Sequence, residues 1–152
     1  VLINSVGAAA SNPRAHAHLA GEELAFLETL PRAPLELASL PALGGVEVLQ
    51  LTPPFPAVSV GVRGSVAARA TAVHTLLELR SATAFNVVSQ RGVSWFFPRS
   101  SVEVPSPQFP TALGCSELWG RWFFAEQEPF EHATERDLET ALARTGWPRR
   151  EP

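Results

Sequence analysis

The chain has 152 residues, of which 45% are hydrophobic, and this length suits one domain with a core of its own. The formal net charge of −3 argues against a nucleic-acid partner or an anionic membrane surface, since either would favour a basic face. No apolar run approaches the roughly 18–20 residues of a membrane-spanning helix, and no basic-then-apolar leader opens the sequence. We therefore expect neither a nucleic-acid partner nor a membrane partner.

All 12 basic residues are arginine, and the chain contains no Met and no Tyr. Without lysine, any phosphate chemistry must use Arg, His, hydroxyl groups and backbone amides. Cys115 is the single cysteine, which excludes an internal disulfide and a thiolate metal site and fits a reducing, cytoplasmic compartment. We expect neither a metal nor a cofactor. Because the sequence opens without Met inside an apolar, strand-like run, we interpret it as the C-terminal part of a longer protein.

The first part of the chain predicts a short strand, a loop and a second strand. Val1–Asn4 is β-prone, and Ser5–Pro13 is a loop of small residues. Arg14–Ala20 alternates polar and small apolar side chains, which predicts a half-buried strand. A short helix is expected within Glu22–Leu30, and the proline- and glycine-containing Pro31–Gly45 is typical of a connector.

The rest of the chain alternates strand patterns with helix patterns. Five segments have the composition or alternation of strands: Val46–Leu51, Ala57–Val62, Phe85–Ser89, Val93–Phe97 and Glu117–Ala125. The third and fourth of these flank Gln-Arg-Gly and predict a hairpin, which Pro98 is expected to end. Apolar residues at helical spacing predict an amphipathic helix over Val66–Arg80. Ser100–Leu113 is rich in Pro and Ser and is expected to be irregular.

A last helix is predicted near the end of the chain. Thr134 can cap it, Asp137 completes a capping-box-like start, and the helix is expected to run to Thr145 and end at Gly146. The order of strands, helix, strands and helix predicts an α+β fold, in which an antiparallel sheet carries helices on one side.

Arg14-Ala-His16-Ala-His18 is the segment with the clearest chemical content. Alternate side chains project from one face of a strand, so these three would stand in a row with alanines between them. An imidazole can attack phosphorus through its unprotonated nitrogen, and the preceding loop offers neutral donors for phosphate oxygens. Spacing alone leaves two other interpretations open: a metal-binding pair without a well-spaced third ligand, and an edge strand with incidental histidines.

Residues 4–18, Asn-Ser-Val-Gly-Ala-Ala-Ala-Ser-Asn-Pro-Arg-Ala-His-Ala-His, resemble the histidine-triad motif of the galactose-1-phosphate uridylyltransferase superfamily. Within it the segment is most similar to the GDP-hexose phosphorylases, which include GDP-D-glucose and GDP-L-galactose phosphorylases. The resemblance implies that His16 becomes nucleotidylated and that His18 hydrogen-bonds the phosphate in transit. It implies substrate or phosphate contacts at Asn4, Ser5, Gly7, Ser11, Asn12 and Arg14.

Arg14 departs from the family pattern, which usually has the first histidine at this position. Two explanations are open. The side chain could turn inward and add a permanent positive charge beside the phosphate path. Alternatively, it is a solvated residue at the start of the strand, and the supporting role of the first histidine has been lost or moved.

The resemblance extends more loosely over the rest of the chain and implies the second, degenerate half of a double histidine-triad-like fold. Residues 1–20 would be the catalytic loop and histidine strand of the first half, residues 21–56 a connector and first strand, and residues 57–152 the second half. Asn86 and Arg99 are candidate contributors to the site there. The tryptophans are expected in the core or at an interface, namely Trp95, Trp119 and Trp122.

The activity that the resemblance implies is a two-step phosphorolysis of GDP-hexose. A GMP group is carried on His16, inorganic phosphate is the acceptor, and hexose 1-phosphate and GDP are the products. Two alternatives stay open: a dinucleoside polyphosphate phosphorylase or hydrolase, and a non-catalytic nucleotide-binding protein. We expect these 152 residues by themselves to be inactive and to form a homodimer, because the catalytic strand would lack its neighbouring sheet.

Overall fold

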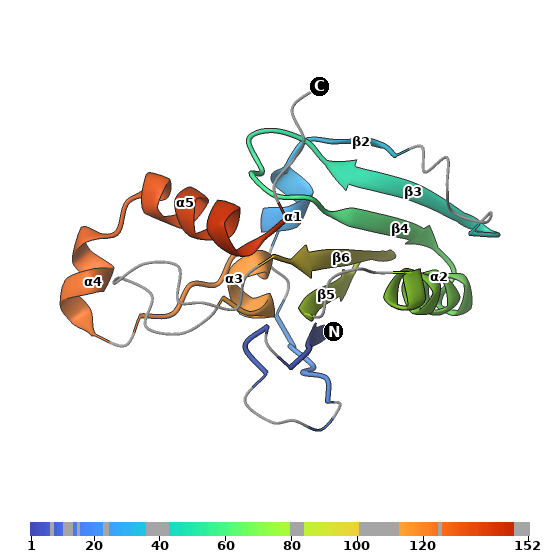
Figure 1. Cartoon of the computed structure of the whole chain (residues 1–152), viewed down its shortest axis with the longest axis horizontal. Coiled ribbons are helices and arrows are strands. Elements are labelled where there is room, and N and C mark those ends of the chain that lie inside the picture. The colour runs from blue at the N-terminus through green and yellow to red at the C-terminus, as the bar shows by residue number, and fades with distance from the viewer. Residues whose placement is uncertain are drawn as a thin grey trace.

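The computed structural model describes residues 1–6, 8–10, 14, 16–22, 25–35, 43–79, 84–100, 113–124 and 126–147. Its frame is one six-stranded antiparallel sheet, which together with the helices makes an α+β fold, as expected (Figure 1). The strands are β1 (Leu2–Asn4), β2 (Arg32–Pro34), β3 (Val46–Leu51), β4 (Val60–Gly64), β5 (Ala84–Gln90) and β6 (Val93–Arg99). Their order across the sheet is β1-β5-β6-β4-β3-β2, so the first strand of the chain lies at one edge.

Helices lie on both faces of this sheet, and the expectation of helices on one side is wrong. They are α1 (Phe26–Thr29), α2 (Val66–Leu79), α3 (Cys115–Trp119), α4 (Gln127–His132) and α5 (Glu135–Thr145). Ala72 of α2 belongs to the core on one face, and Leu118 of α3 and Leu142 of α5 belong to the core on the other. Figure 1 shows α2 on the opposite side of the molecule from α4 and α5. No helix in the described part of the chain is both long and apolar enough to cross a membrane.

The reason for this two-sided burial is that the central strands are apolar on both faces. In β6, Trp95 and Phe97 belong to the core beneath α1, α3 and α5, whereas Phe96 belongs to the core beneath α2. In β5, Val88 belongs to the core beneath α1, α3 and α5, and Val87 belongs to the core beneath α2. A strand whose successive side chains are all apolar must be covered on both faces.

The predicted hairpin is confirmed, but Pro98 does not end its second strand. Arg91 and Gly92 form the turn with φ angles of 43° and 77°, the left-handed values that a tight two-residue hairpin requires. Pro98 lies opposite Phe85 in the register of the two strands. The backbone N–H and C=O of Phe85 point away from Pro98, toward β1, and bond to Ser5. The Phe85–Pro98 pair therefore requires no N–H from proline, and β6 continues to Arg99.

Two other segments differ from the prediction. Within Glu117–Ala125, predicted as a strand, the described residues form the end of α3 and an irregular stretch. Gly120 ends α3 with φ 101°, and the side chain of Phe26 lies so close that a Cβ on this glycine would come within 2.5 Å of it. The expected connector Pro31–Gly45 contains β2, which pairs with β3 at the edge of the sheet.

The helix predictions that rested on local signals are confirmed. α2 covers Val66–Leu79, and α1 forms within the range expected for a short helix. α5 begins after Thr134, whose Oγ1 accepts from Asp137 N over 3.3 Å while Asp137 Oδ2 accepts from Thr134 N over 2.9 Å. It ends at Gly146, as expected. The expected irregular segment Ser100–Leu113 lies, between its two end residues, outside the described residues.

Candidate functional site

The histidine segment lies along the outer edge of β1, but it is not a strand. Its described residues pair with the sheet through one isolated bridge between His18 and Leu2, whose backbone groups exchange hydrogen bonds of 2.9 and 2.8 Å. The prediction of a half-buried strand over Arg14–Ala20 is therefore wrong. The alanines between the polar residues offer too little apolar area to hold the segment against the core. The segment projects from the sheet as a loop (Figure 1).

The two imidazoles nevertheless lie side by side. The ring centroids of His16 and His18 are 5.1 Å apart and the ring planes are inclined by 74°. His16 is half-buried and His18 is exposed. The proximity of the two rings agrees with the sequence prediction, and their joint action on one group stays a prediction.

A backbone carbonyl sets the tautomer of His16. The distance from its Nδ1 to Arg14 O is 2.8 Å. A carbonyl oxygen can only accept, so Nδ1 must carry the hydrogen, and in the neutral ring Nε2 then holds the free lone pair. Because Nε2 is the nitrogen so prepared, the ring is ready for nucleophilic attack from that side.

Arg14 contributes to this arrangement through its backbone. Its carbonyl contacts His16, and its side chain is exposed. Of the two explanations left open for this position, the exposed side chain agrees with a solvated residue. A carbonyl is present whatever the side chain, so the orientation of His16 does not require a histidine at position 14.

Asn4 and Ser5 are engaged in holding the start of the preceding loop. Asn4 Oδ1 accepts from Asn86 Nδ2 over 2.7 Å and from Cys115 N over 2.8 Å. Ser5 Oγ accepts from Phe85 N over 2.7 Å, and Ser5 N donates to Phe85 O over 3.0 Å. These bonds attach the loop to β5 and to the start of α3, and contacts of either residue with phosphate stay a prediction.

Three further predicted site residues, Gly7, Ser11 and Asn12, lie outside the described residues. Their expected contacts with substrate or phosphate therefore stay predictions. The loop residues that the structure does describe are placed by packing as well as by hydrogen bonds. Ala8 is 1% exposed, and Ala9 lies close to Gly114 at the start of α3. The loop therefore passes directly over α3.

A buried polar cluster, made of Asn86, Arg99, Cys115 and Glu117, lies beneath this loop. Asn86 is fully buried and donates to Ala8 O over 3.0 Å in addition to Asn4. Its Oδ1, and Nε and Nη2 of Arg99, are buried without a hydrogen-bond partner among the described residues. Asn86 and Arg99 were predicted from the sequence, whereas the contribution of α3 was not, because Cys115 is 111 residues from Asn4 in the chain and no local pattern connects them.

Arg99 is held at the junction of β6 and α5. Its carbonyl accepts from Trp147 Nε1 over 3.0 Å, and Ser100 N donates to Thr145 O over 3.1 Å. Burial lowers the pKa of Arg99 to about 10, although the nearby Cys115 and Glu117 oppose this shift. The guanidinium therefore still carries its charge at neutral pH.

Cys115 is an inert thiol rather than a second nucleophile. Burial raises its pKa to about 12, and the nearby positive charge of Arg99 opposes this rise only in part. Its Sγ lies 2.9 Å from Ile3 O and 3.2 Å from Val87 O, and its one S–H donates to one of these carbonyls at a time. Because the thiolate is the reactive form of cysteine, this side chain does no chemistry at neutral pH and instead joins α3 to β1 and β5.

Comparison of the chain with protein-family models, with curated proteins and with solved structures finds no match. Within the described ranges, no three His, Cys, Asp or Glu side chains gather in a group that could hold a metal ion. The functional argument therefore rests on the histidine segment and on the residues that hold it.

Proposed function

We propose that this protein is a nucleotidyltransferase that acts on GDP-hexose with His16 as its covalent nucleophile. The observation that carries the proposal is the 2.8 Å contact between His16 Nδ1 and Arg14 O, which assigns the hydrogen of the neutral ring to Nδ1 and the lone pair to Nε2. His18 lies beside it, with ring centroids 5.1 Å apart, within reach of a group bonded to His16. A prepared nucleophile next to a second imidazole suits transfer of a phosphorus group.

The proposed reaction has two displacements at the same phosphorus atom. In the first, Nε2 of His16 attacks the α-phosphorus of GDP-hexose, a P–N bond forms, the bond to the bridging oxygen breaks, and hexose 1-phosphate leaves. In the second, an oxygen of inorganic phosphate attacks this phosphorus, the P–N bond breaks, and GDP leaves with His16 restored. His18 is proposed to donate to the equatorial oxygens as charge develops on them.

Phosphate is the favoured acceptor because the segment offers no carboxylate base for water. The described residues from Val1 to Ala20 include no Asp or Glu, and Glu22 is exposed and paired with Arg121 over 2.6 Å. A neutral water molecule requires a base to remove its proton, whereas phosphate is already an anion. Phosphorolysis is therefore proposed over hydrolysis.

The fold is compatible with this function. An antiparallel sheet with a histidine segment bound at its edge supports the interpretation of the chain as histidine-triad-like, and we include that relationship in the proposal. The bonds from Asn4 to β5 and to α3 support it further, since they fix the loop that precedes the histidines. A loop held on both sides can present its backbone amides to phosphate oxygens with little reorganisation.

The test is capture of the covalent intermediate. Full-length protein is incubated with GDP-glucose in the absence of phosphate and analysed by intact-mass spectrometry. We expect a gain of one GMP group that is labile in acid and stable in base, as a phosphoramidate is. His16→Ala should abolish the adduct, and His74→Ala, which changes an exposed histidine on α2, should retain it. Turnover by wild-type protein that never acquires the adduct would contradict the proposal.

A further inference from the structure

A cavity of about 360 Å³ lies beside the turn of the β5–β6 hairpin. Its lining comes from α1, β2, β4 and the hairpin, and consists of Glu28, Arg32, Arg63, Gln90, Arg91, Val93 and Trp95. Three of the chain's 12 basic residues therefore surround one hollow in a protein whose formal net charge is −3. The proposed function uses none of these residues.

Hydrogen bonds hold the arginine side chains in place around the cavity. Arg32 donates from Nη2 to Glu28 O over 2.9 Å, Arg63 from Nη1 to Glu47 Oε2 over 2.7 Å, and Arg91 from Nη1 to Glu28 Oε2. A guanidinium has five N–H donors in a planar fork, so one such bond at Arg32 or Arg63 does not exhaust its capacity. Planar forks of this kind match the oxygens of a phosphate group.

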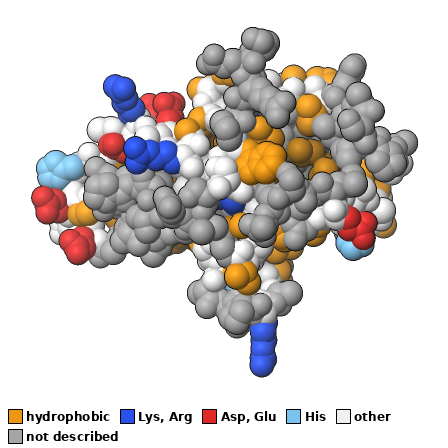
Figure 2. Space-filling view, viewed as in Figure 1, with side chains coloured by type: hydrophobic (Ala, Val, Ile, Leu, Met, Phe, Trp, Pro, Cys, Tyr) orange, Lys and Arg blue, Asp and Glu red, His pale blue; other side chains and the backbone are white. Residues whose placement is uncertain are grey.

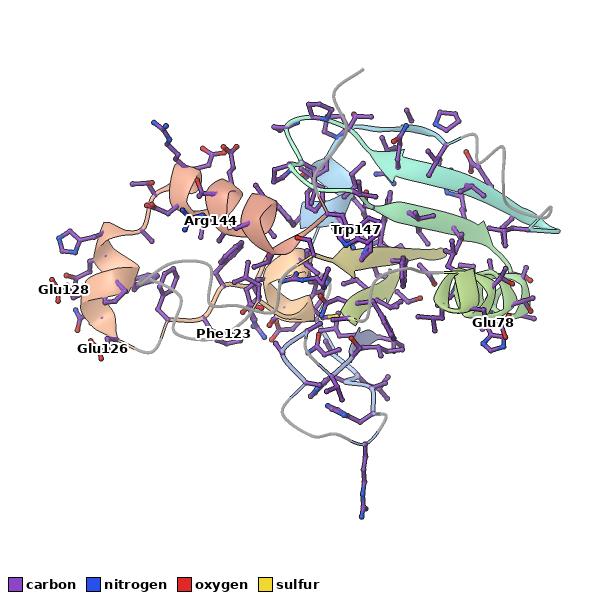
Figure 3. The ribbon with its side chains drawn as sticks, viewed as in Figure 1. Glu78, Phe123, Glu126, Glu128, Arg144 and Trp147 are labelled. Carbon is purple, nitrogen blue, oxygen red and sulfur yellow. The ribbon has the colours of Figure 1, made fainter. Side chains whose placement is uncertain are left out.

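The charge around the cavity favours an anion. Three guanidinium groups and one carboxylate line it, a formal charge of +2 (3 − 1), and the carboxylate of Glu47, which is paired with Arg63, reduces the local charge to +1 (2 − 1). Acidic side chains gather instead around α4, where Glu126 and Glu128 are exposed (Figures 2 and 3). Val93 and Trp95 form an apolar, buried part of the lining, and weaker solvent screening there strengthens attraction between opposite charges.

Glu28 adds a second requirement on the ligand. Its Oε2 pairs with Arg91, but its Oε1 is buried and has no hydrogen-bond partner among the described residues. A buried carboxylate oxygen without a donor is unfavourable, and a ligand with a hydroxyl or N–H group would supply that donor once the Glu28 side chain, which is 26% exposed, turns Oε1 toward the cavity. Inorganic phosphate carries its hydroxyl on the same phosphorus atom as the oxygens that the arginines would bind. A phosphate ester of a sugar or nucleoside has hydroxyl or N–H groups away from the phosphate, so it can satisfy the arginines and Glu28 together.

We propose that this cavity binds a small phosphate ester. Arg32, Arg63 and Arg91 donate to the phosphate oxygens, and Glu28 Oε1 accepts from a hydroxyl or N–H group of the same molecule. The site contains neither histidine of the candidate active site, so it does not depend on the proposed transfer reaction.

The experiment is a titration of the isotope-labelled chain followed by NMR, with glucose 1-phosphate, GMP and inorganic phosphate as probes. We expect saturable shifts of the Trp95 indole and Gly92 amide signals, with at least one ester binding fivefold or more tightly than inorganic phosphate. Equal affinity for all three probes, or shifts confined to residues away from the cavity, would overturn the proposal. His16→Ala should bind the probes as wild type does, which separates this site from the proposed active site.

Variants and chemical modification complete the test. The double variant Arg32→Gln/Arg63→Gln should raise the Kd tenfold or more, whereas Arg136→Gln, on the exposed part of α5, should change it less than twofold. A double variant that binds like wild type refutes the site.

Wild-type protein treated with phenylglyoxal gives a readout that requires no variant to fold. Bound glucose 1-phosphate should protect Arg32 and Arg63 but not Arg136, and equal modification of all three with and without ligand would also refute it.

Discussion

Asn86 Nδ2 donates to Asn4 Oδ1 over 2.7 Å and so joins two side chains that are 82 positions apart in the chain. The same amide group donates to Ala8 O, so one buried residue of β5 holds both the first strand and the loop that leads to the histidines. This buried carboxamide is therefore one of the groups that attach the candidate active site to the sheet, beside the bonds from Ser5 to Phe85 and from His18 to Leu2.

Removal of this carboxamide should destabilise the fold. In Asn86→Ala both hydrogen bonds are lost, Ala8 O is left without this donor, and a cavity opens. We expect the free energy of unfolding in urea to fall by about 2–4 kcal/mol. Gln127→Ala, which truncates an exposed amide on α4, is the control and should cost less than about 1 kcal/mol. Equal losses for the two variants would show that Asn86 does not hold the loop.

The role of Arg14 can be divided between its carbonyl and its side chain. Because the carbonyl sets the His16 tautomer, Arg14→Ala should leave that tautomer unchanged, as read from the imidazole nitrogen shifts by NMR. With the side chain solvated, turnover by the full-length variant should stay within twofold of wild type. A tenfold or greater loss of kcat/KM, equivalent to about 1.4 kcal/mol, would show instead that the guanidinium binds the phosphate in transit.

The stability of the chain should fall between pH 9 and pH 10 because of Cys115. Burial raises the pKa of this thiol from 9.0 to about 12, so above pH 9 the unfolded chain loses a proton that the folded chain keeps. Fewer protons are then bound in the unfolded state, and the free energy of unfolding decreases, by about 1 kcal/mol over this interval. Tyr and Lys, which would also titrate here, are absent from the chain, and Arg99, whose pKa is lowered to about 10, opposes the decrease by only a few tenths of a kcal/mol (roughly 0.3) as pH 10 is approached.

Urea denaturation at these two pH values tests the thiol effect, with Cys115→Ala as the comparison. The variant should be less stable overall, since a buried side chain is truncated, but its stability should change little between pH 9 and pH 10. An equal decrease in both proteins would assign the pH dependence to another group. Above pH 10 the lowered pKa of Arg99 acts in the opposite direction, so the comparison stops there.

Gly61 should not tolerate a side chain. A Cβ at this position would lie 2.5 Å from Trp95 Cζ3, and the indole is 2% exposed and cannot move away freely. We expect Gly61→Ala to lower the free energy of unfolding by about 1–3 kcal/mol, measured by thermal or urea denaturation. Gly44→Ala is the matched control, since a Cβ there meets no atom within 4 Å. Similar stabilities for the two variants would contradict the close packing of β4 against β6.

The products should identify the acceptor. With millimolar-scale phosphate, full-length protein and GDP-glucose should yield GDP well in excess of GMP, because the segment supplies no carboxylate base to activate water. Glu22→Gln should leave this ratio unchanged, since Glu22 is exposed and paired with Arg121. Chromatography of the nucleotides gives the answer directly. GMP as the main product would favour the hydrolase that the sequence also allows.

The elements that the sequence alone determines are those whose signals are local. Thr134, Asp137 and Gly146 bound α5 because a capping box and a helix end depend on neighbouring backbone groups. Val46–Leu51 forms β3 over the predicted residues, and the hairpin forms where the sequence places its turn. The pairing of His16 with His18 was predicted from their places on one face of a strand, and the rings lie together although the segment is a loop.

The tertiary structure alone decided the features that depend on distant partners. Pro98 stays within β6 because Phe85 bonds to Ser5 on its other side, and α3 replaces an apolar strand pattern where Gly120 meets Phe26. The histidine segment stays a loop, since its alanines bury too little area to join the sheet. The buried polar cluster and the arginine-lined cavity each consist of residues from several elements. These residues are far apart in the sequence and come into contact only in the folded chain, so no local sequence pattern predicts them.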